Sequence, residues 1–318
     1  MSMELKLSRS NRVYFPGESI EGKIIVNSSS SISYQKVLVT VAGTVNLQVR
    51  GGTGGVIESL YSVVKPICFL KKVIEVSPPG GKLSPGRSEV PFSFILSSKD
   101  TNNRGRLYET FHGGNISIQY LVTADIIRGY LHKSLTATVE FLVESNKTIS
   151  QVVPAQPESV NFYITQDTQK HQLLPELLTG RFRITGKIST QCSLVDPLLG
   201  ELTVDASSVP LNSIDIQLLR VESILAGERI ISDTSVVQTT QVADGDVCRS
   251  LTLPIYVILP RLLVCPTVLS GSFDIEFQVS IVISFQSELS KLYPKADLRT
   301  PRPWLAMVTL PLRLYRAS

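Results

Sequence analysis

Few side chains in this 318-residue chain have the types and spacing that catalysis or metal binding requires. The three histidines, His112, His132 and His171, are scattered, and none has a second His or Cys at metal-ligand spacing. No Ser occupies the Gly-x-Ser-x-Gly sequence that presents the nucleophile of α/β-hydrolases. We therefore interpret the histidines as structural or surface residues. The sequence predicts a protein that is not an enzyme and that has no metal or other cofactor.

A glycine-rich segment, residues 51–55, reads Gly-Gly-Thr-Gly-Gly and invites comparison with phosphate-binding loops. Such a site needs the glycines to lead into a helix whose N-terminal amides face the anion. Here the following residues, 56–64, have the composition of another strand. We therefore predict that residues 51–55 form a loop tip between strands, because glycine is the usual residue where the backbone turns tightly.

One loop carries charged and apolar side chains together. Residues 241–250 read Gln-Val-Ala-Asp-Gly-Asp-Val-Cys-Arg-Ser and lie between two predicted strands. Asp-Gly is a common hairpin-turn pair, so an ordinary β-turn is the simplest interpretation. A calcium loop is excluded, because the other oxygen ligands at regular spacing and the closing Glu are missing. As a turn, the segment would present Asp244, Asp246 and Arg249 beside the apolar Val247.

The elements that would position this loop follow one pattern in both halves of the chain. Each half has a Pro-led turn entering a strand, then a strand interrupted by proline, then a long alternating strand. The corresponding segments are residues 16–26 and 197–204, residues 89–96 and 251–258, and residues 116–125 and 273–285. In the last of these, apolar side chains occupy every second position from Phe273 to Phe285, and only Val282 breaks the alternation.

An apolar face of this kind has to be covered by a second sheet. The sequence therefore predicts an all-β protein with two tandem β-sandwich domains, an architecture that binds other molecules more often than it catalyses. The length agrees, because 318 residues exceed the size at which a single hydrophobic core usually stops growing. We predict domains at residues 1–148 and 149–318. The polar segment 145–159, with two prolines, is the expected linker.

Targeting signals and cysteine usage bear on the compartment. The N-terminal residues contain no apolar run typical of a signal peptide, and the longest apolar region, residues 251–264, is interrupted by two prolines and an arginine. The four cysteines form no Cys-x-x-Cys pair, and we expect them to be small buried side chains in a reducing compartment. They are Cys68, Cys192, Cys248 and Cys265. A cytoplasmic protein is predicted.

Positive charge is concentrated at the C-terminal end. Residues 291–318 contain six Lys or Arg and one Asp, a local charge of +5, while the whole chain carries +4. The remainder is therefore close to neutral, which removes the main electrostatic support for nucleic-acid binding. The basic, Pro-rich residues 291–304 could attract an anionic membrane weakly. We favour a solvated loop, because the charges are spread out and no amphipathic helix is evident.

Several long strings of residues resemble one known family. They are residues 241–267, together with residues 43–48, 64–67, 108–113 and 118–120. These strings are similar to those of the Vps26 family, and the resemblance extends from about residue 5 to residue 290. It is specific, because long strings rarely match by chance. Residues 291–304 depart from it, since they look longer than the corresponding part of the family's animal-type members.

The resemblance implies an arrestin-like fold and a non-catalytic role in Retriever, a retromer-like complex that recycles cargo from endosomes. It implies docking of the second domain on a Vps35-like helical-repeat subunit, alongside a Vps29-type subunit. Cargo adaptors of the sorting-nexin type, and peripheral attachment to endosomal membrane through partners, are compatible with it. The family's contact with the helical subunit maps onto residues 244–249 here. We expect Asp244, Asp246 and Arg249 as charged contacts and Val247 as the apolar anchor, with Gly245 and Cys248 completing the site.

Two other classes remain as alternatives. An arrestin-type cytosolic adaptor for membrane-protein trafficking or ubiquitination would share the fold. Such α-arrestin adaptors carry Pro-Pro-x-Tyr motifs, whereas Pro78-Pro79 is followed here by two glycines. An enzyme on a β-sandwich is the least favoured class, because it would need a buried group of titratable side chains in a pocket.

Overall fold

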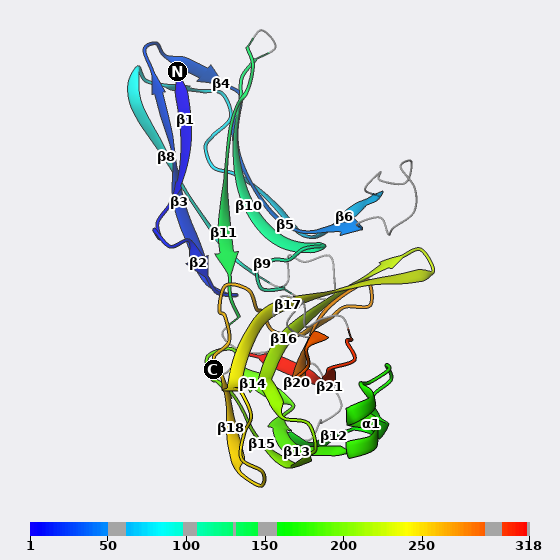
Figure 1. The fold of residues 1–318 in the computed structure, drawn as a ribbon. Coiled ribbons are helices and arrows are strands. Elements are labelled where there is room, and N and C mark those ends of the chain that lie inside the picture. Colours follow the sequence, from blue (N-terminus) through cyan, green and yellow to red (C-terminus); the bar gives the residue numbers. More distant parts are fainter. Residues whose placement is uncertain (50–61, 98–106, 130–131, 146–157, 290–300, 317–318) are drawn as a thin grey trace. The chain divides into compact units, whose positions relative to one another are not determined.

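The chain folds into two units rich in β-strand. The computed structural model describes residues 1–49, 62–97, 107–129, 132–145, 158–289 and 301–316. The units are Met1–Asn146 and Lys147–Ser318 (Figure 1). Some sequence predictions lie outside the described residues. They are the glycine segment 51–55, most of the linker 145–159 with the boundary predicted between residues 148 and 149, and most of the basic segment 291–304.

Unit 1 contains a three-stranded and a six-stranded sheet. The smaller sheet has the order β1 (Ser2–Leu7), β3 (Ser19–Ser28), β8 (Gly86–Ile95). The larger has the order β2 (Val13–Tyr14), β11 (Leu135–Val143), β10 (Ile116–Ile127), β5 (Lys36–Val49), β6 (Ser62–Glu75), with β9 (Phe111–His112) beside β10. The short strands β4 (Ile32–Tyr34) and β7 (Gly81–Leu83) pair with each other.

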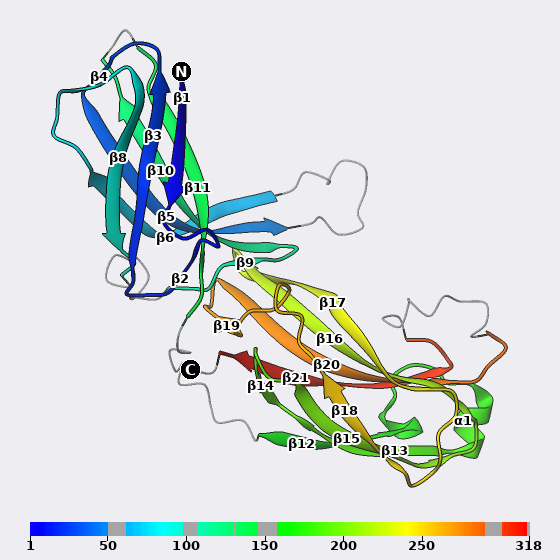
Figure 2. The ribbon, with the colours of Figure 1, turned by 90° about the vertical axis from the view of Figure 1, so that its left-hand side faces the viewer.

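Unit 2 contains a four-stranded and a six-stranded sheet (Figure 2). The smaller sheet has the order β12 (Ser159–Thr165), β13 (Phe182–Ser189), β15 (Leu198–Ser207), β18 (Thr252–Val257). The larger has the order β14 (Gln191–Ser193), β21 (Leu305–Tyr315), β20 (Phe273–Phe285), β16 (Leu211–Ala226), β17 (Arg229–Asp244), with β19 (Val268–Leu269) beside β20. A short 3₁₀ turn (Gln166–Thr168) and the helix α1 (Pro175–Gly180) precede β13.

The two units repeat one topology. The order β1-β3-β8 corresponds to β13-β15-β18, and β2-β11-β10-β5-β6 corresponds to β14-β21-β20-β16-β17. Even the one parallel pairing of each larger sheet recurs, between β2 and β11 and between β14 and β21. The prediction of an all-β fold with two tandem sandwiches is confirmed. The segments that looked alike in the sequence are β3 and β15, β8 and β18, and β10 and β20.

Alternating side chains form the core of each unit. In β20 the seven alternate residues from Phe273 to Phe285 are at most 2% exposed, and in β10 the six from Ile116 to Ile126 are all 0% exposed. Val282, which broke the alternation, is buried on the opposite face of β20. It packs there with Trp304 and Leu305, and the partly buried Leu174 packs against this cluster. The exception therefore has a packing partner elsewhere in the chain.

His171 helps to hold the segment before α1 against this cluster. Its Nε2 lies 2.8 Å from the carbonyl oxygen of Leu305 and 3.1 Å from that of Arg302. The Leu174 amide also donates to the Pro303 carbonyl, at 2.9 Å. These contacts give His171 a structural role, as the sequence analysis expected for the histidines.

The cysteines correct one expectation. Cys192 and Cys265 are buried, and burial raises the pKa of the Cys192 thiol to about 11. Cys68 and Cys248 are exposed, so the prediction of four buried cysteines is wrong for these two. Cys68 lies on β6, at the edge of its sheet, and Cys248 lies in the loop after β17.

The prolines inside β8 and β18 mark the edges of the smaller sheets. Pro91 lies opposite Lys23 of β3, and Pro254 lies opposite Glu201 of β15. Both strands are last in their sheets, and a proline is tolerated there because it has no N–H to donate to a ladder. The preceding residue of each partner strand is a glycine, Gly22 or Gly200.

Gly22 is required by close packing. A Cβ atom at this position would lie 2.5 Å from the Phe92 ring and 2.7 Å from the backbone oxygen of Lys6. Gly200 is in the same situation, 2.7 Å from the backbone oxygen of Lys187. A backbone oxygen in a paired strand cannot move aside without disturbing the hydrogen bonds of the sheet. Both units therefore need a residue without a Cβ atom at this position.

We expect Gly22→Ala to destabilise unit 1 by about 1–3 kcal/mol, the usual cost of overpacking a well-packed site. Gly129→Ala is the matched control, because its Cβ would meet nothing closer than the Gln35 amide nitrogen at 3.8 Å. Urea unfolding followed by circular dichroism measures both. Equal midpoints for Gly22→Ala and the wild type would contradict the packing argument.

Candidate partner-binding site

The loop after β17 lies at one end of the unit 2 sandwich. At this end β15 and β17 finish, and β16 and β18 begin. Arg181, just after α1 (Figure 2), lies here too, since its carbonyl accepts a hydrogen bond from the Ser208 amide at 3.3 Å. β17 belongs to the six-stranded sheet and β18 to the four-stranded sheet. The loop therefore crosses between sheets, and the interpretation of Asp244-Gly245 as a β-hairpin turn is wrong.

Asp246 and Arg249 hold the loop in shape. The Arg249 Nη1 donates to Asp246 Oδ1 at 2.9 Å, and the same carboxylate oxygen accepts from the Leu211 amide at 2.9 Å. Arg249 also donates to the carbonyl oxygens of Val247 and Ser207. The two charged side chains thus connect the loop to the end of β15 and the start of β16.

The backbone is fixed at both ends of the loop. The Gly245 amide donates to the Asn212 carbonyl at 2.8 Å, and the Ser250 amide donates to the Val204 carbonyl at 2.9 Å. Gly245 has a φ of +80°, a conformation that glycine adopts without the steric cost of a Cβ atom. The loop is therefore preformed by contacts within unit 2.

The remaining site residues are displayed by this scaffold. Asp244 and Cys248 are exposed, and Val247 is half-buried. Asp244 Oδ1 accepts a long hydrogen bond from Gln241 Nε2, at 3.4 Å. The six predicted residues are thus together, and they divide into a supporting set (Gly245, Asp246, Arg249) and a displayed set (Asp244, Val247, Cys248).

The electrostatics of the site centre on Asp246. Two hydrogen bonds hold the pKa of this carboxyl below its usual range. The bond from Arg249 has the larger effect and the bond from the Leu211 amide the smaller. The side chains of Asp246 and Arg249 are 41% and 31% exposed, so their ion pair is screened by water. Its main effect is on the geometry of the loop.

Sequence reasoning missed the supporting residues outside the loop. Leu211 lies 35 positions and Ser207 lies 42 positions from their charged partners. Both contribute backbone groups only, and any side chain would allow such a contact. No signal in the residue types could therefore have identified them.

The other chemistry-bearing residues belong to other elements of the chain. His112 lies on β9 and contacts Glu140 at 3.1 Å, while His171 packs near Leu305. Within the described residues, no three His, Cys, Asp or Glu side chains are grouped so that they could hold a metal ion. An open depression of about 520 Å³ on the smaller sheet of unit 2 is lined by residues that include Tyr163, Lys187 and Glu201, and by none of the histidines. No helix in the described part of the chain is long and apolar enough to cross a membrane.

Comparison with known proteins shows to which family the chain belongs. The family model described as vacuolar protein sorting-associated protein 26 matches residues 2–288. The chain belongs to the Vps26 family. Vacuolar protein sorting-associated protein 26C of Dictyostelium discoideum is 32% identical over 290 residues, which cover 89% of this chain and 94% of that protein. Vacuolar protein sorting-associated protein 26 of Caenorhabditis elegans is 20% identical over 303 residues, 92% of this chain and 74% of that protein.

Membership of the Vps26 family confirms the arrestin-like fold and the resemblance found in the sequence. Vps26 proteins are retromer-type trafficking subunits that act in protein transport and endosomal sorting together with other subunits. The greater identity to the 26C relative, over nearly its whole length, supports a Vps26C-type protein. The matched region ends at residue 288, just before the basic segment that departed from the family pattern.

We expect Asp246→Ala to loosen the start of β16. At pH 7 the Leu211 amide should exchange with solvent about tenfold faster than in the wild type, because its acceptor is lost. The folded-state pKa of Asp246 is lowered. The Asp246 carboxylate therefore stabilises the start of β16 fully at a pH above the ordinary Asp pKa of about 4. This stabilisation is lost as the pH falls through the lowered folded-state pKa.

Amide exchange measured by NMR in a series from pH 7 down to about pH 2, well below the ordinary Asp pKa, tests this expectation. The difference between wild type and Asp246→Ala should shrink at the lower pH. Asp244→Ala serves as the control, because the Leu211 amide donates to Asp246, whereas Asp244 accepts from Gln241. A pH-independent difference would contradict the assigned role of the carboxylate.

Proposed function

We propose that this Vps26-family chain is the non-catalytic arrestin-like subunit of a Retriever-type complex that sorts and recycles cargo at endosomes. The observation that carries the proposal is the identity of 32% to a 26C protein over 94% of that protein's length. In this proposal the chain is cytoplasmic. It is held at the endosomal surface by its partners, which include a Vps35-like helical-repeat subunit, a Vps29-type subunit and cargo adaptors of the sorting-nexin type.

We propose further that residues 244–249 contact the Vps35-like subunit. A preformed loop supports this, because ordering a flexible segment on binding would cost about 1–2 kcal/mol per residue. The displayed set combines the half-buried Val247 with the exposed Asp244 and Cys248. An apolar anchor flanked by polar groups is the usual composition of an interface centre and its rim.

The hydrogen bonds of Asp246 and Arg249 determine which substitutions can test this proposal. Arg249 donates to Asp246 and to two carbonyl oxygens, so Arg249→Glu would disturb the loop as well as any partner contact. Val247→Asp and Asp244→Lys alter displayed side chains, and neither takes part in the bonds from Arg249 to Asp246 or from Leu211 to Asp246. These two variants separate contact with a partner from loop structure.

We expect Val247→Asp to weaken binding of the Vps35-like subunit about 30-fold or more, the effect of losing an interface hot spot of about 2 kcal/mol. Asp244→Lys should weaken it less and change its salt dependence, because a rim charge acts mainly on association. Isothermal titration calorimetry with the purified partner gives the affinities.

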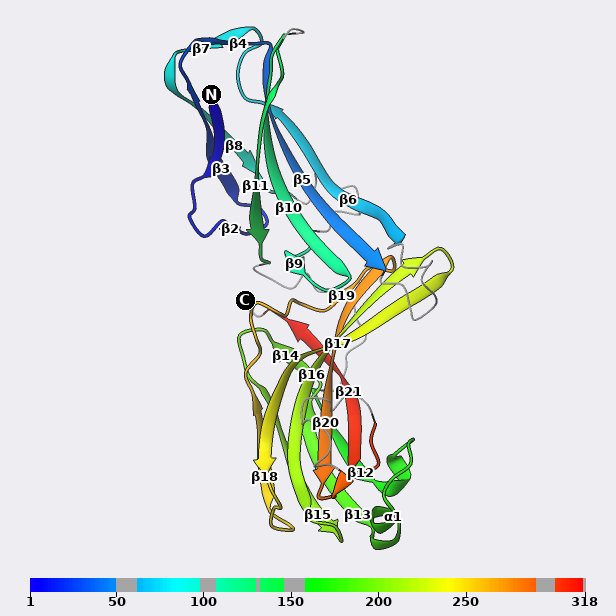
Figure 3. The ribbon, with the colours of Figure 1, turned by 45° about the horizontal axis from the view of Figure 1, so that its top comes forward.

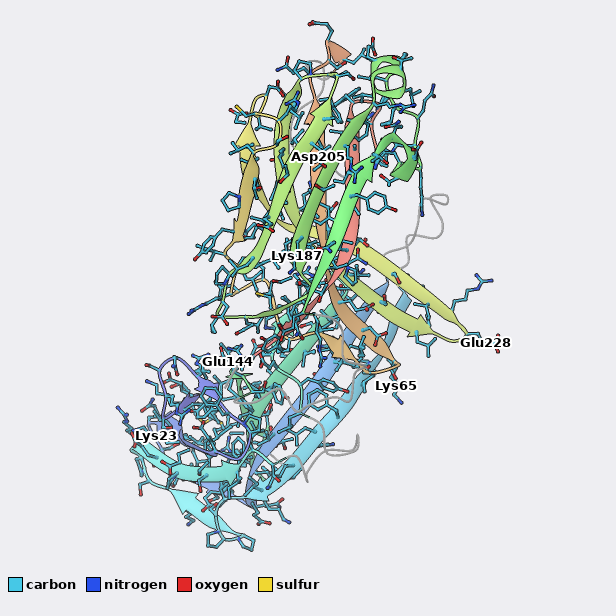
Figure 4. The ribbon with its side chains drawn as sticks, turned by 90° about the horizontal axis from the view of Figure 1, so that it is seen from below. Lys23, Lys65, Glu144, Lys187, Asp205 and Glu228 are labelled. Atoms are coloured by element: carbon cyan, nitrogen blue, oxygen red, sulfur yellow. The ribbon has the colours of Figure 1, made fainter. Side chains whose placement is uncertain are left out.

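Lys187→Glu is the matched control for a change of charge. Lys187 lies on β13, on the outer face of the smaller sheet of unit 2 (Figure 4). Wild-type affinity is expected for this variant. Unchanged affinity in folded Val247→Asp protein would refute the loop as the docking site, while failure of the wild type to bind any Vps35-like subunit would refute the proposed complex.

A further inference from the structure

Strand β17 forms the outer edge of the six-stranded sheet in unit 2. No described strand pairs with its outer side, and none of its 16 residues is buried. With β16 it forms a long hairpin whose tip, at Glu228, stands clear of the unit 2 sandwich (Figures 3 and 4). The strand thus offers a row of backbone donors and acceptors to a partner strand.

The equivalent edge in unit 1 is protected, and this one is not. β6 occupies the same place in its sheet and carries Lys65, Pro66, Lys71 and Lys72, residues that natural edge strands use against pairing. β17 has neither Lys nor Pro, and β-branched residues make up half of it. Its exposed apolar side chains include Ile230, which is 72% exposed, and Ile231, which is 38% exposed.

The register of the hairpin fixes which backbone groups point outward. Pairing with β16 is regular from Arg229 to Val236, before a bulge near Leu219. Ala226 lies opposite Arg229 across the turn, and closure of a four-residue turn makes this a hydrogen-bonded pair. Because such pairs alternate, Ile231 directs its backbone groups toward β16, whereas Ile230 and Ser232 direct theirs outward.

The charges along this stretch are symmetric about Ile231. Arg229 and Asp233 are each two positions from Ile231, on the same face of the strand, and both are exposed. An antiparallel copy of the same stretch would therefore place opposite charges against each other twice.

We propose that β17 pairs in antiparallel fashion with β17 of a second copy of this chain, centred on Ile231. In this register Arg229 faces the partner's Asp233, and Asp233 faces the partner's Arg229. Ile231 packs against the partner's Ile231 at a position where side chains approach most closely. Ile230 and the partner's Ser232 exchange the outward backbone hydrogen bonds, and the six-stranded sheet continues into its copy.

Other registers are less favourable. Moving the copy by two residues places Arg229 opposite the partner's Ser235 or the partner's Ile231. A larger shift places Asp233 opposite the partner's Asp233, which is destabilising. The charges thus select one register. A single pair of strands buries less than the roughly 1,200 Å² of a stable interface, so association should be weak and concentration-dependent.

Sedimentation equilibrium of the full chain at low salt tests the proposal. The wild-type mass should rise toward twice 34.9 kDa as the concentration increases. Arg229→Asp alone places like charges in both pairs, as does Asp233→Arg alone, and each should lower the association constant about tenfold or more. An equimolar mixture of the two variants restores opposite charges in both pairs, so it should recover association.

Recovery in the mixture also shows that both variants are folded. Lys187→Glu is the control for a surface charge change and should associate like the wild type. A wild-type chain that stays monomeric at millimolar concentration, or a mixture no better than its components, would overturn the proposal. Binding of an unrelated strand peptide to β17 without self-association would overturn it too. These outcomes are independent of whether the chain binds a Vps35-like subunit.

Discussion

The alternation of apolar and polar side chains along the central strands is the constraint on which both units depend. Every second residue of β20 is sealed against the smaller sheet, and β16 contributes Ile214, Ile216 and Leu218 to the same core. A shift of one residue between these strands would turn a whole face to water. At about 1.5–3 kcal/mol for each large side chain, seven such residues would cost as much as the entire stability of a typical domain. This cost fixes the register of the paired strands. The positions of the loops at the strand ends follow from that register.

Because the two units have the same topology, the structural features that they share can be distinguished from those in which they differ. Cores, the close approach at Gly22 and Gly200, and the edge prolines occur in both. The other edges differ, since β6 carries lysines and a proline where β17 carries β-branched residues. Within β16 the alternation also includes an ion pair. Arg220 and Glu222 occupy core-face positions, 2.8 Å apart and 11% and 4% exposed. Buried core residues, Leu218 and Ile224, lie on the same face to either side of this pair.

Features that depend on local periodicity could be predicted from the sequence. Features that depend on contact with a segment distant in the sequence could not. Period-two alternation and strand-breaking prolines are local, so two sandwiches with matching strands could be predicted from them. Val282 could not be understood in this way, because its burial depends on Trp304 and Leu174, which lie in other segments. The exposure of Cys68 and Cys248 was also missed. Residue type suggests burial for cysteine, but a sheet edge and an inter-sheet loop leave these two in contact with water.

The candidate loop also combines features that could be predicted from the sequence with features that could not. Residue types and family resemblance led to the prediction of a site at residues 244–249, with Asp244, Asp246 and Arg249 as its charged contacts. In the structure, Asp246 and Arg249 bind each other and backbone groups of β15 and β16. A screened ion pair adds little stability by itself. Its value here is that the loop has lost its conformational freedom before any partner arrives. In the proposed interface, the displayed residues Asp244, Val247 and Cys248 would make the partner contacts, and the pair of Asp246 and Arg249 holds the loop that carries them.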